Sequence, residues 1–192
     1  RAKPGKFLQQ ITIGSFGSLT TTVGRVSSRC SIGTTAMTNA LQFDNGGSAA
    51  AWVVSNSTTM NIYSPIHMNS PLYITNQWTG TLAFPSRNIT GLGNDLHVVT
   101  LTSGVVFIDG GANTGNTFSN LYIHGNSQLN ARQSPGDFAK YPLGRGTVLM
   151  EGGATLFVQN LRCWVTNDIV LLGNATLKYN SDRNDHARYA GV

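Results

Sequence analysis

Charged side chains are scarce in this sequence. Only 11% of its 192 residues are Asp, Glu, Lys or Arg, whereas an average soluble protein has roughly a quarter. The net charge of +5 arises because eight acidic residues accompany thirteen basic ones. The basic residues are scattered rather than clustered with aromatic residues, so the pattern argues against nucleic-acid binding.

Long apolar runs and regular helical repeats are also missing. No stretch approaches the roughly 18 apolar residues that a membrane-spanning helix needs, so no membrane span is expected. Neither the glycine period of collagen nor the charged heptads of a coiled coil is present. Hydrophobic residues nevertheless make up 40% of the chain, which excludes a disordered protein. We therefore expect a single domain over residues 1–192.

One long segment is almost free of charge. Between Arg29 and Arg87 the only formal charge is Asp44. Soluble monomers usually keep a charged surface that prevents association. The neutral segment indicates either a surface covered by subunits, glycans or other parts of a larger protein, or a low-charge extracellular domain.

The cysteines and the asparagine sequons bear on the cellular compartment. Cys30 and Cys163 either form one disulfide in an oxidising compartment or are two separate buried thiols. The chain starts at Arg1 without Met, as expected of a processed chain or a fragment. Sequons suited to N-glycosylation, and hence to secretion, begin at Asn56, Asn88 and Asn174.

A short repeat organises the C-terminal half. Residues 147–181 divide without gaps into five units of seven, with an apolar residue in the third place and Gly, Asn or Ser in the seventh. Valine, threonine and aromatic residues between such breakers indicate short strands rather than a helix. The units predict corners near Gly153, Asn160, Asn167 and Asn174. They also predict inward-pointing side chains at Leu149, Leu156, Val170 and Leu177.

Three of these units make a longer repeat. VLMEGGATL at 148–156 recurs as IVLLGNATL at 169–177, and a related LYIHGNSQL lies further upstream, at 121–129. The longer separation of the upstream copy is explained by an inserted loop over residues 132–146, rich in Pro and Gly. A period of roughly 20–25 residues, built from short strands, is typical of a β-solenoid. The sequence therefore predicts an all-β, parallel β-helix-like solenoid of about 21 residues per turn; the alternative is a jelly roll or other β-sandwich.

The N-terminal segment differs from the rest of the chain in amino-acid composition. Residues 41–192 keep the composition of stacked short strands. In residues 1–40, the segment 7–16 alternates well enough for one strand, and mostly Gly, Ser and Thr with isolated Val and Ile follow it. We expect residues 1–40 to be a cap over the end of the solenoid or an extended arm. As an arm, the segment would pair with a neighbouring subunit, with Ile11 and Ile13 fixing the register.

The sequences GGATLFVQN and GNATLKYN carry a family resemblance. They resemble the Gly-rich turns of parallel β-helix proteins, especially secreted adhesins of the autotransporter and haemagglutinin type. The resemblance covers residues 105–181. It implies the fold and a secreted or outer-surface setting, and it implies no particular activity.

A few residues are candidates for chemistry. In the aligned repeats the place before Gly is Asp109, His124 or Glu151, and stacking of adjacent turns would bring His124 and Glu151 within hydrogen-bonding reach. Such a pair is an acid/base or metal site, or a surface ion pair. Asp109 precedes His124 by only 15 residues, which is less than one full turn, so its spacing does not place it in this column. Tyr141, in the inserted loop, is an exposed candidate for carbohydrate binding. No catalytic motif, metal-ligand spacing or cofactor fingerprint occurs, so we assign no catalytic residue, no metal and no cofactor.

Three classes of function remain open. The first is a non-enzymatic structural protein outside the cell or on its surface, forming filaments or acting as an adhesin with a carbohydrate or cell-surface ligand. The second is a viral or phage fibre or capsid component in a virion. The third is a polysaccharide lyase or hydrolase built on a β-helix.

Overall fold

The computed structural model has strands and turns and no helix in the residues it describes. Accordingly, no helix in this part of the chain is long and apolar enough to cross a membrane. The described residues are 12–13, 18–22, 30–32, 40–55, 58–85, 88–109, 115–132, 141–159, 164–179 and 188–189.

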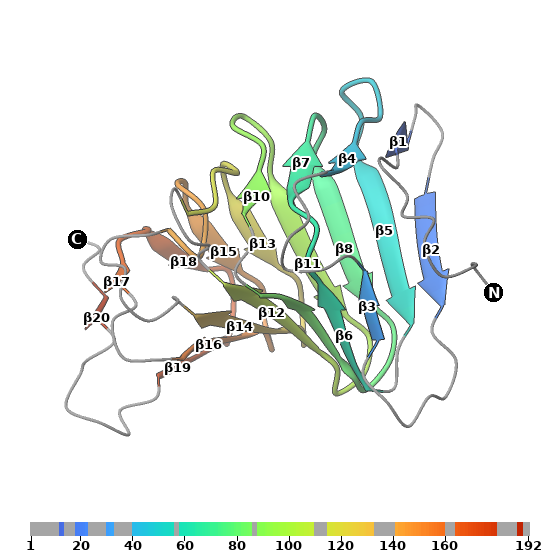
Figure 1. Cartoon of the computed structure of the whole chain (residues 1–192). Coiled ribbons are helices and arrows are strands. Elements are labelled where there is room, and N and C mark those ends of the chain that lie inside the picture. The colour runs from blue at the N-terminus through green and yellow to red at the C-terminus, as the bar shows by residue number, and fades with distance from the viewer. Residues whose placement is uncertain are drawn as a thin grey trace.

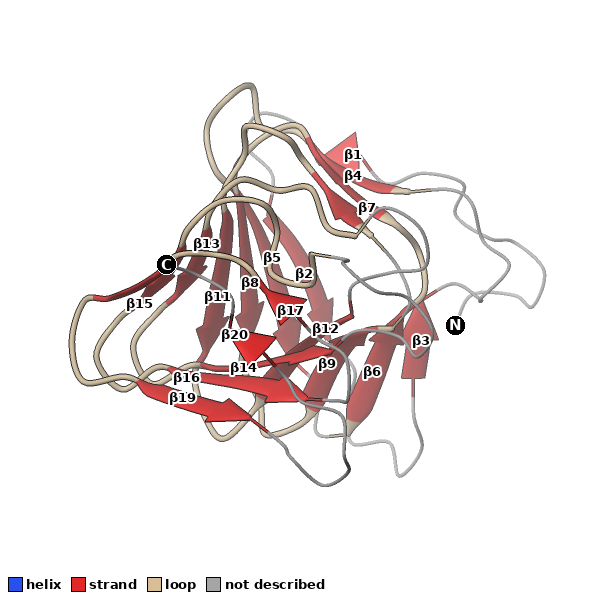
Figure 2. Cartoon of the chain, turned by 90° about the vertical axis from the view of Figure 1, so that its left-hand side faces the viewer, coloured by secondary structure: helices blue, strands red, loops and turns tan. Residues whose placement is uncertain are grey.

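Three parallel sheets surround one interior (Figures 1 and 2). Sheet I has seven strands, in the order β2 (Ser18–Thr22), β5 (Ala50–Ser55), β8 (Leu72–Asn76), β11 (Leu96–Thr100), β13 (Leu121–Ile123), β15 (Val148–Met150) and β18 (Ile169–Leu171). Sheet II has seven, in the order β3 (Cys30–Ile32), β6 (Thr59–Ile62), β9 (Thr81–Phe84), β12 (Val105–Asp109), β14 (Gln128–Arg132), β16 (Thr155–Gln159) and β19 (Thr176–Tyr179). Sheet III has four, in the order β1 (Thr12–Ile13), β4 (Leu41–Phe43), β7 (Ile66–Met68) and β10 (Ile89–Thr90). A fourth, two-stranded sheet joins β17 (Trp164–Val165) to β20 (Arg188–Tyr189).

This topology is a β-solenoid, as the repeat predicts. Successive turns of the chain each add one strand to sheet I and one to sheet II, and the first four turns also add one to sheet III; every strand pair in the described part of the chain is parallel. In the last turn Val148 pairs with Ile169, which is the spacing that the sequence repeat gives. The typical offset is about 24 residues, as between Leu72 and Leu96. The expected period is therefore correct locally and too short for most of the chain, because the corners differ in length.

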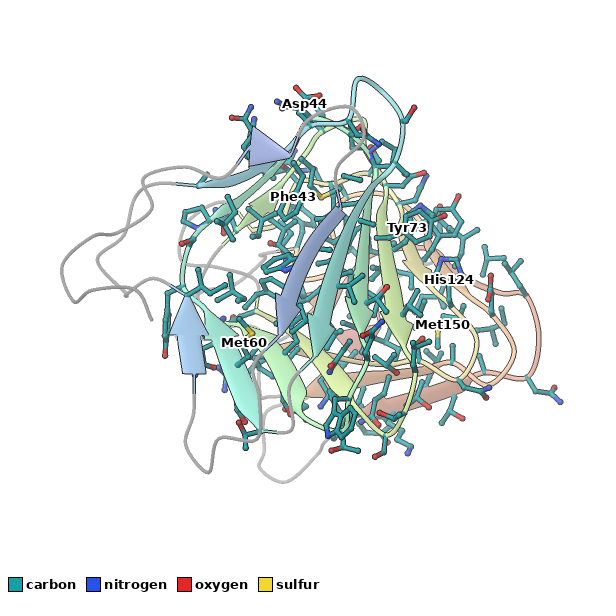
Figure 3. All side chains as sticks on the ribbon, turned by 90° about the vertical axis from the view of Figure 1, so that its right-hand side faces the viewer. Phe43, Asp44, Met60, Tyr73, His124 and Met150 are labelled. Carbon is teal, nitrogen blue, oxygen red and sulfur yellow. The ribbon has the colours of Figure 1, made fainter. Side chains whose placement is uncertain are left out.

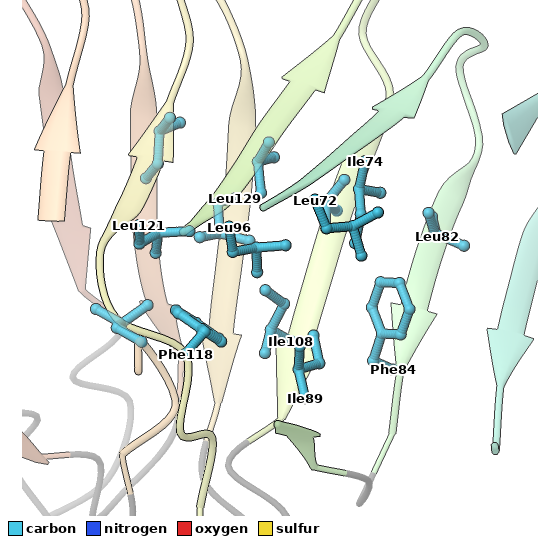
Figure 4. Packing of buried hydrophobic residues seen from close by; sticks show 14 of the residues in the cluster. Leu72, Ile74, Leu82, Phe84, Ile89, Leu96, Ile108, Phe118, Leu121 and Leu129 are labelled. Carbon is cyan, nitrogen blue, oxygen red and sulfur yellow. The ribbon is translucent and has the colours of Figure 1, made fainter. Parts of the chain in front are cut away.

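The core consists of columns of apolar side chains running along the solenoid axis. In sheet I, the column Leu72, Leu96, Leu121 and Val148 is fully buried. Figure 4 shows the three leucines of this column side by side. Burying each such side chain contributes about 1.5–3 kcal/mol. Because every strand is in register with the next, the same type of residue recurs at the same depth.

The seven-residue unit misassigns half of the expected core. Leu156 is buried and faces inward, as predicted. The prediction for Leu149 is wrong: it lies between buried Val148 and Met150, so it points outward, and Val170 pairs with it on the same outer face. Leu177 is in register with Leu156 but is exposed, because no further turn among the described residues covers it. Side chains along a strand alternate between its two faces, so residues at equivalent places of successive seven-residue units need not lie on the same face. Residues that pair in register in adjacent turns do lie on the same face.

Of the four predicted corners, the three that fall within the described residues are present. Gly153 lies in a turn with φ of 84°, and an added Cβ there would collide with the side chain of Asn126 in the corresponding corner one turn earlier. Asn167 is buried and donates hydrogen bonds to the carbonyls of Gly144 and Gly146, at 3.2 and 2.6 Å. Asn174 lies in an exposed bend, and Asn160 lies outside the described residues.

Parts of the N-terminal segment form the first turn. β1, β2 and β3 are the end strands of sheets III, I and II. Ile13 pairs with Phe43 of the same chain, so one edge of this short strand is occupied within the subunit. Ile11 lies outside the described residues, and the role of both isoleucines in assembly stays a prediction. Cys30 pairs with Met60 in β6; because Cys163 lies outside the described residues, the disulfide also stays a prediction.

Candidate functional site

A row of stacked rings lies on the outer face of sheet I. Tyr73, His97 and Tyr122 occupy one outward-facing column in β8, β11 and β13. The ring centroids of Tyr73 and His97 are 4.0 Å apart with the planes 4° from parallel. Those of His97 and Tyr122 are 4.5 Å apart at 12°. The imidazole of His97 is thus held between two phenol rings.

A chain of hydrogen bonds continues from His97. Its Nδ1 lies 3.0 Å from Nε2 of His124. Nδ1 of His124 lies 3.0 Å from Oε1 of Glu151. The other carboxylate oxygen of Glu151 accepts a hydrogen bond from the backbone N–H of Gly125 at 2.9 Å. Figure 3 shows Tyr73 and His124 together on the outer side of the sheet.

The repeat itself places these side chains together. His124 directly follows β13 and Glu151 directly follows β15, at equivalent places of the sequences LYIHGN and VLMEGG. The backbone N–H of Glu151 donates to the carbonyl of Ile123, and each corner is closed by a tight turn. The two side chains are consequently one turn apart, at the spacing that the aligned repeats gave them.

The local environment sets the charge of these groups. Burial, with a smaller contribution from nearby His124, lowers the pKa of His97 from 6.5 to about 4, although Asp95 and Glu151 oppose the shift. The hydrogen bond from Gly125 lowers the pKa of Glu151, and His124 lowers it further. At neutral pH the site therefore contains a neutral imidazole at His97 and a carboxylate at Glu151.

Asp109 belongs to a different place in the molecule. It lies at the end of β12 in sheet II, fully buried, with its carboxylate 3.2 Å from the guanidinium of Arg132 in β14. The same guanidinium lies 4.8 Å from the ring centroid of Phe107. This ion pair links adjacent turns of sheet II and does not join the His124–Glu151 pair.

The remaining candidates are dispersed. Tyr141 is exposed, with the guanidinium of Arg145 5.4 Å from its ring centroid. Of the sequon residues, Asn174 is exposed, Asn88 is half-buried, and Asn56 lies outside the described residues. Among the described residues, no group of three His, Cys, Asp or Glu side chains is arranged to hold a metal ion.

The sequence contains a signal for His97 and its tyrosine neighbours that the seven-residue repeat misses. LYIT at 72–75, LHVV at 96–99 and LYIH at 121–124 share an aromatic or histidine residue between two aliphatic residues. Alignment of these three strands places the rings in one column. A constant spacing along the chain does not reveal this column. The number of residues between paired positions differs between these strands and differs again in the last turn.

The last turn of the solenoid has an open end. β18 and β19 are the end strands of sheets I and II. Leu171, Leu177 and Tyr179 are in register with the buried residues Met150, Leu156 and Val158 of the preceding turn. They are nevertheless 51%, 41% and 63% exposed. In the part of the chain that the structure describes, three core columns therefore end without a covering residue.

Comparison with protein-family models, curated proteins and solved structures found no match.

Proposed function

We propose that this protein is a structural subunit that assembles end to end into a filament outside the cell. The observation that carries the proposal is the exposed face of the last described turn, where Leu171, Leu177 and Tyr179 continue core columns and no described strand covers them. Exposed apolar side chains beside unpaired strand edges favour pairing with another chain.

The opposite end of the solenoid has matching geometry. β2 and β3 end the same two sheets as β18 and β19, and each has one neighbour in its sheet. A translation of a second copy along the axis would set its β2 against β18 and its β3 against β19. Both new pairs would be parallel, like every pair within the described part of the chain. Such head-to-tail contacts do not close on themselves and therefore build filaments.

The composition of the proposed contact surface between two subunits favours association. The described residues of the last turn from β18 to β19 carry one charged side chain, Lys178. Covering Leu171, Leu177 and Tyr179 would bury the exposed part of each side chain. Leu171 and Leu177 are 51% and 41% exposed, so each would contribute about 1 kcal/mol, roughly half of the value for full burial. Main-chain hydrogen bonds between the end strands would add affinity and direction.

The proposed setting is extracellular or on a cell surface. The low charge of the chain and the exposed sequon at Asn174 support it. An adhesive role with a carbohydrate or cell-surface ligand is compatible with the same scaffold, and a fibre in a virion would use the same end-to-end contact.

Sedimentation velocity at increasing protein concentration, with negative-stain microscopy, tests the proposal. The wild-type chain should form elongated species, and Leu171→Lys should abolish them because it places a charge over the core. Val170→Lys is the matched control, since Val170 lies beside Leu171 but points outward. A wild-type chain that stays monomeric at high concentration, or a Leu171→Lys chain that assembles normally, would contradict end-to-end assembly.

A further inference from the structure

The hydrogen-bonded chain on sheet I ends at a ring nitrogen with no partner. Nδ1 of His97 is occupied by His124, and among the described residues nothing is hydrogen-bonded to Nε2. We propose that Glu151, His124 and His97 form a proton relay that makes Nε2 of His97 the general base for water attacking a carboxylic ester. This activity goes beyond the structural role proposed above and does not depend on it.

The protons in the chain can be assigned from the partners. Ionised Glu151 only accepts hydrogen bonds, so Nδ1 of His124 must carry the proton that joins them. With this proton on Nδ1, His124 presents the lone pair of its other nitrogen, Nε2, which accepts the Nδ1–H of His97. Neutral His97 is left with a lone pair on Nε2, ready to accept a proton.

The relay moves the positive charge that forms on protonation to a position beside the carboxylate of Glu151. A cation on His97 is unfavourable because its ring is half-buried between Tyr73 and Tyr122. When Nε2 of His97 takes a proton, Nδ1–H of His97 can pass to Nε2 of His124. The positive charge then rests on His124, whose Nδ1 is 3.0 Å from Glu151. A base that would be too weak alone is thereby strengthened.

Two phenol rings stack on the imidazole that carries this nitrogen. Because a phenol is longer than an imidazole and the three rings are nearly parallel, we expect the hydroxyls of Tyr73 and Tyr122 to reach beyond the ring of His97. Each hydroxyl is a hydrogen-bond donor. Either hydroxyl could donate to the carbonyl oxygen of an ester bound on its side of the base as negative charge develops on that oxygen.

The reaction balances without a further reactant. The oxygen of water bonds to the acyl carbon while one of its protons moves to Nε2 of His97, and the carbonyl π electrons move to the carbonyl oxygen. When the tetrahedral intermediate collapses, the C–O bond to the alcohol breaks and its electrons leave with the alkoxide. The relay then reverses, and the proton on Nε2 returns to the alkoxide or to solvent. The products are one acid and one alcohol.

The nucleophile and the substrate class follow from what surrounds the base. Among the described residues, no Ser, Thr or Cys side chain is hydrogen-bonded to either histidine of the relay. Water is therefore the nucleophile. General-base catalysis of this kind typically contributes about 10²–10⁴-fold, which suits an ester with a good leaving group better than an amide.

Hydrolysis of 4-nitrophenyl acetate by the purified full chain tests the activity. His97→Phe keeps a ring in the stack and removes the base, so kcat/KM should fall by about 10²-fold. Glu151→Gln should lower kcat/KM by a smaller factor, because His124 loses its charged partner. His67→Phe is the control. It removes a histidine of sheet III whose Nδ1 is 2.8 Å from Oγ1 of Thr90, and sheet III contains no residue of the relay, so this variant should hydrolyse the ester like the wild type. Equal rates for wild type and His97→Phe would overturn the proposal.

Nitrogen-15 NMR provides a readout of the relay itself. Both His97 and His124 should be Nδ1–H tautomers at neutral pH, and Glu151→Gln should change the tautomer distribution of His124. An Nε2–H tautomer at His97 in the wild-type protein would overturn the relay. Leu171→Lys should hydrolyse the ester like the wild type, so a failure of assembly and a failure of catalysis are distinguishable.

Discussion

The middle turns and the last turn contain the same kinds of residue in the same columns, yet their burial differs completely. Leu156 in β16 is fully buried, whereas Leu177, its partner in β19, is 41% exposed. Nothing about leucine itself explains this difference. In a solenoid each turn is covered only by its neighbours, so stability is close to a sum over turns and their contacts. The comparison shows that burial here is supplied by the next turn.

The largest expected effect comes from truncating the same residue type in the two regions. Leu156→Ala should lower the free energy of unfolding by about 2–5 kcal/mol, because it leaves a cavity among fully buried neighbours. Leu177→Ala should lower it by less than about 1 kcal/mol, because the side chain is already partly in water. Urea unfolding of both variants in the Leu171→Lys background, where assembly is expected to be blocked, measures the difference. Equal losses would mean that the last turn is covered in solution.

A smaller effect is expected at the corners of the middle turns. Gly153→Ala should lower the free energy of unfolding by roughly 1–2 kcal/mol, because alanine is strained at a φ of 84° and its Cβ would collide with Asn126. Gly152→Ala is the matched control, since the nearest atom to its added Cβ is 4.0 Å away. Thermal unfolding of the two variants compares adjacent positions of one turn; similar melting temperatures would contradict the stacked corner.

The most specific effect, no larger than the one at the corner, concerns pH and acts through the ring stack of the middle turns. The pKa of His97 is 6.5 in the unfolded chain and about 4 in the folded protein. Between these values the unfolded state binds more protons, so stability should fall as the pH drops from 6.5 to 4. Because His97 is only half-buried, solvent screening reduces the loss to about 1–2 kcal/mol.

His97→Phe should flatten that part of the pH profile. The lowered pKa of Glu151 adds a separate loss of stability that begins at more acidic pH, near its ordinary value of 4.5. Melting temperatures of wild type and variant, measured from neutral pH down to the folded-state pKa of His97, separate the two contributions. Parallel profiles would exclude His97 as the titrating group.

Much of the architecture could be predicted because the repeat is written in the sequence. VLMEGGATL and IVLLGNATL hold equivalent places in consecutive turns, and their strands pair at the spacing of the repeat. The face of the strand to which each side chain points was less predictable. Leu149 and Leu156 occupy the same place in a seven-residue unit, but strand alternation directs them to opposite sides.

The candidate site was partly predictable for a related reason. His124 and Glu151 precede Gly in two clear copies of the repeat, so their contact follows from alignment. His97, Tyr73 and Tyr122 lie in turns whose corners have different lengths, and their stacking depends on strand register rather than on a constant period. The exposure of Leu177 could not be predicted either, because it depends on what lies beyond the last strand of its sheet.

The strictly parallel stacking of the turns has a mechanical consequence. The first and last turns lie at opposite ends of the sheets (Figure 1). A force that pulls these ends apart loads the outermost strands first, so turns should detach one after another instead of failing together. Each turn of about 24 residues would release about 80 Å of extended chain, at roughly 3.3–3.6 Å per residue. Such stepwise lengthening would let the molecule absorb tension while the inner turns stay folded.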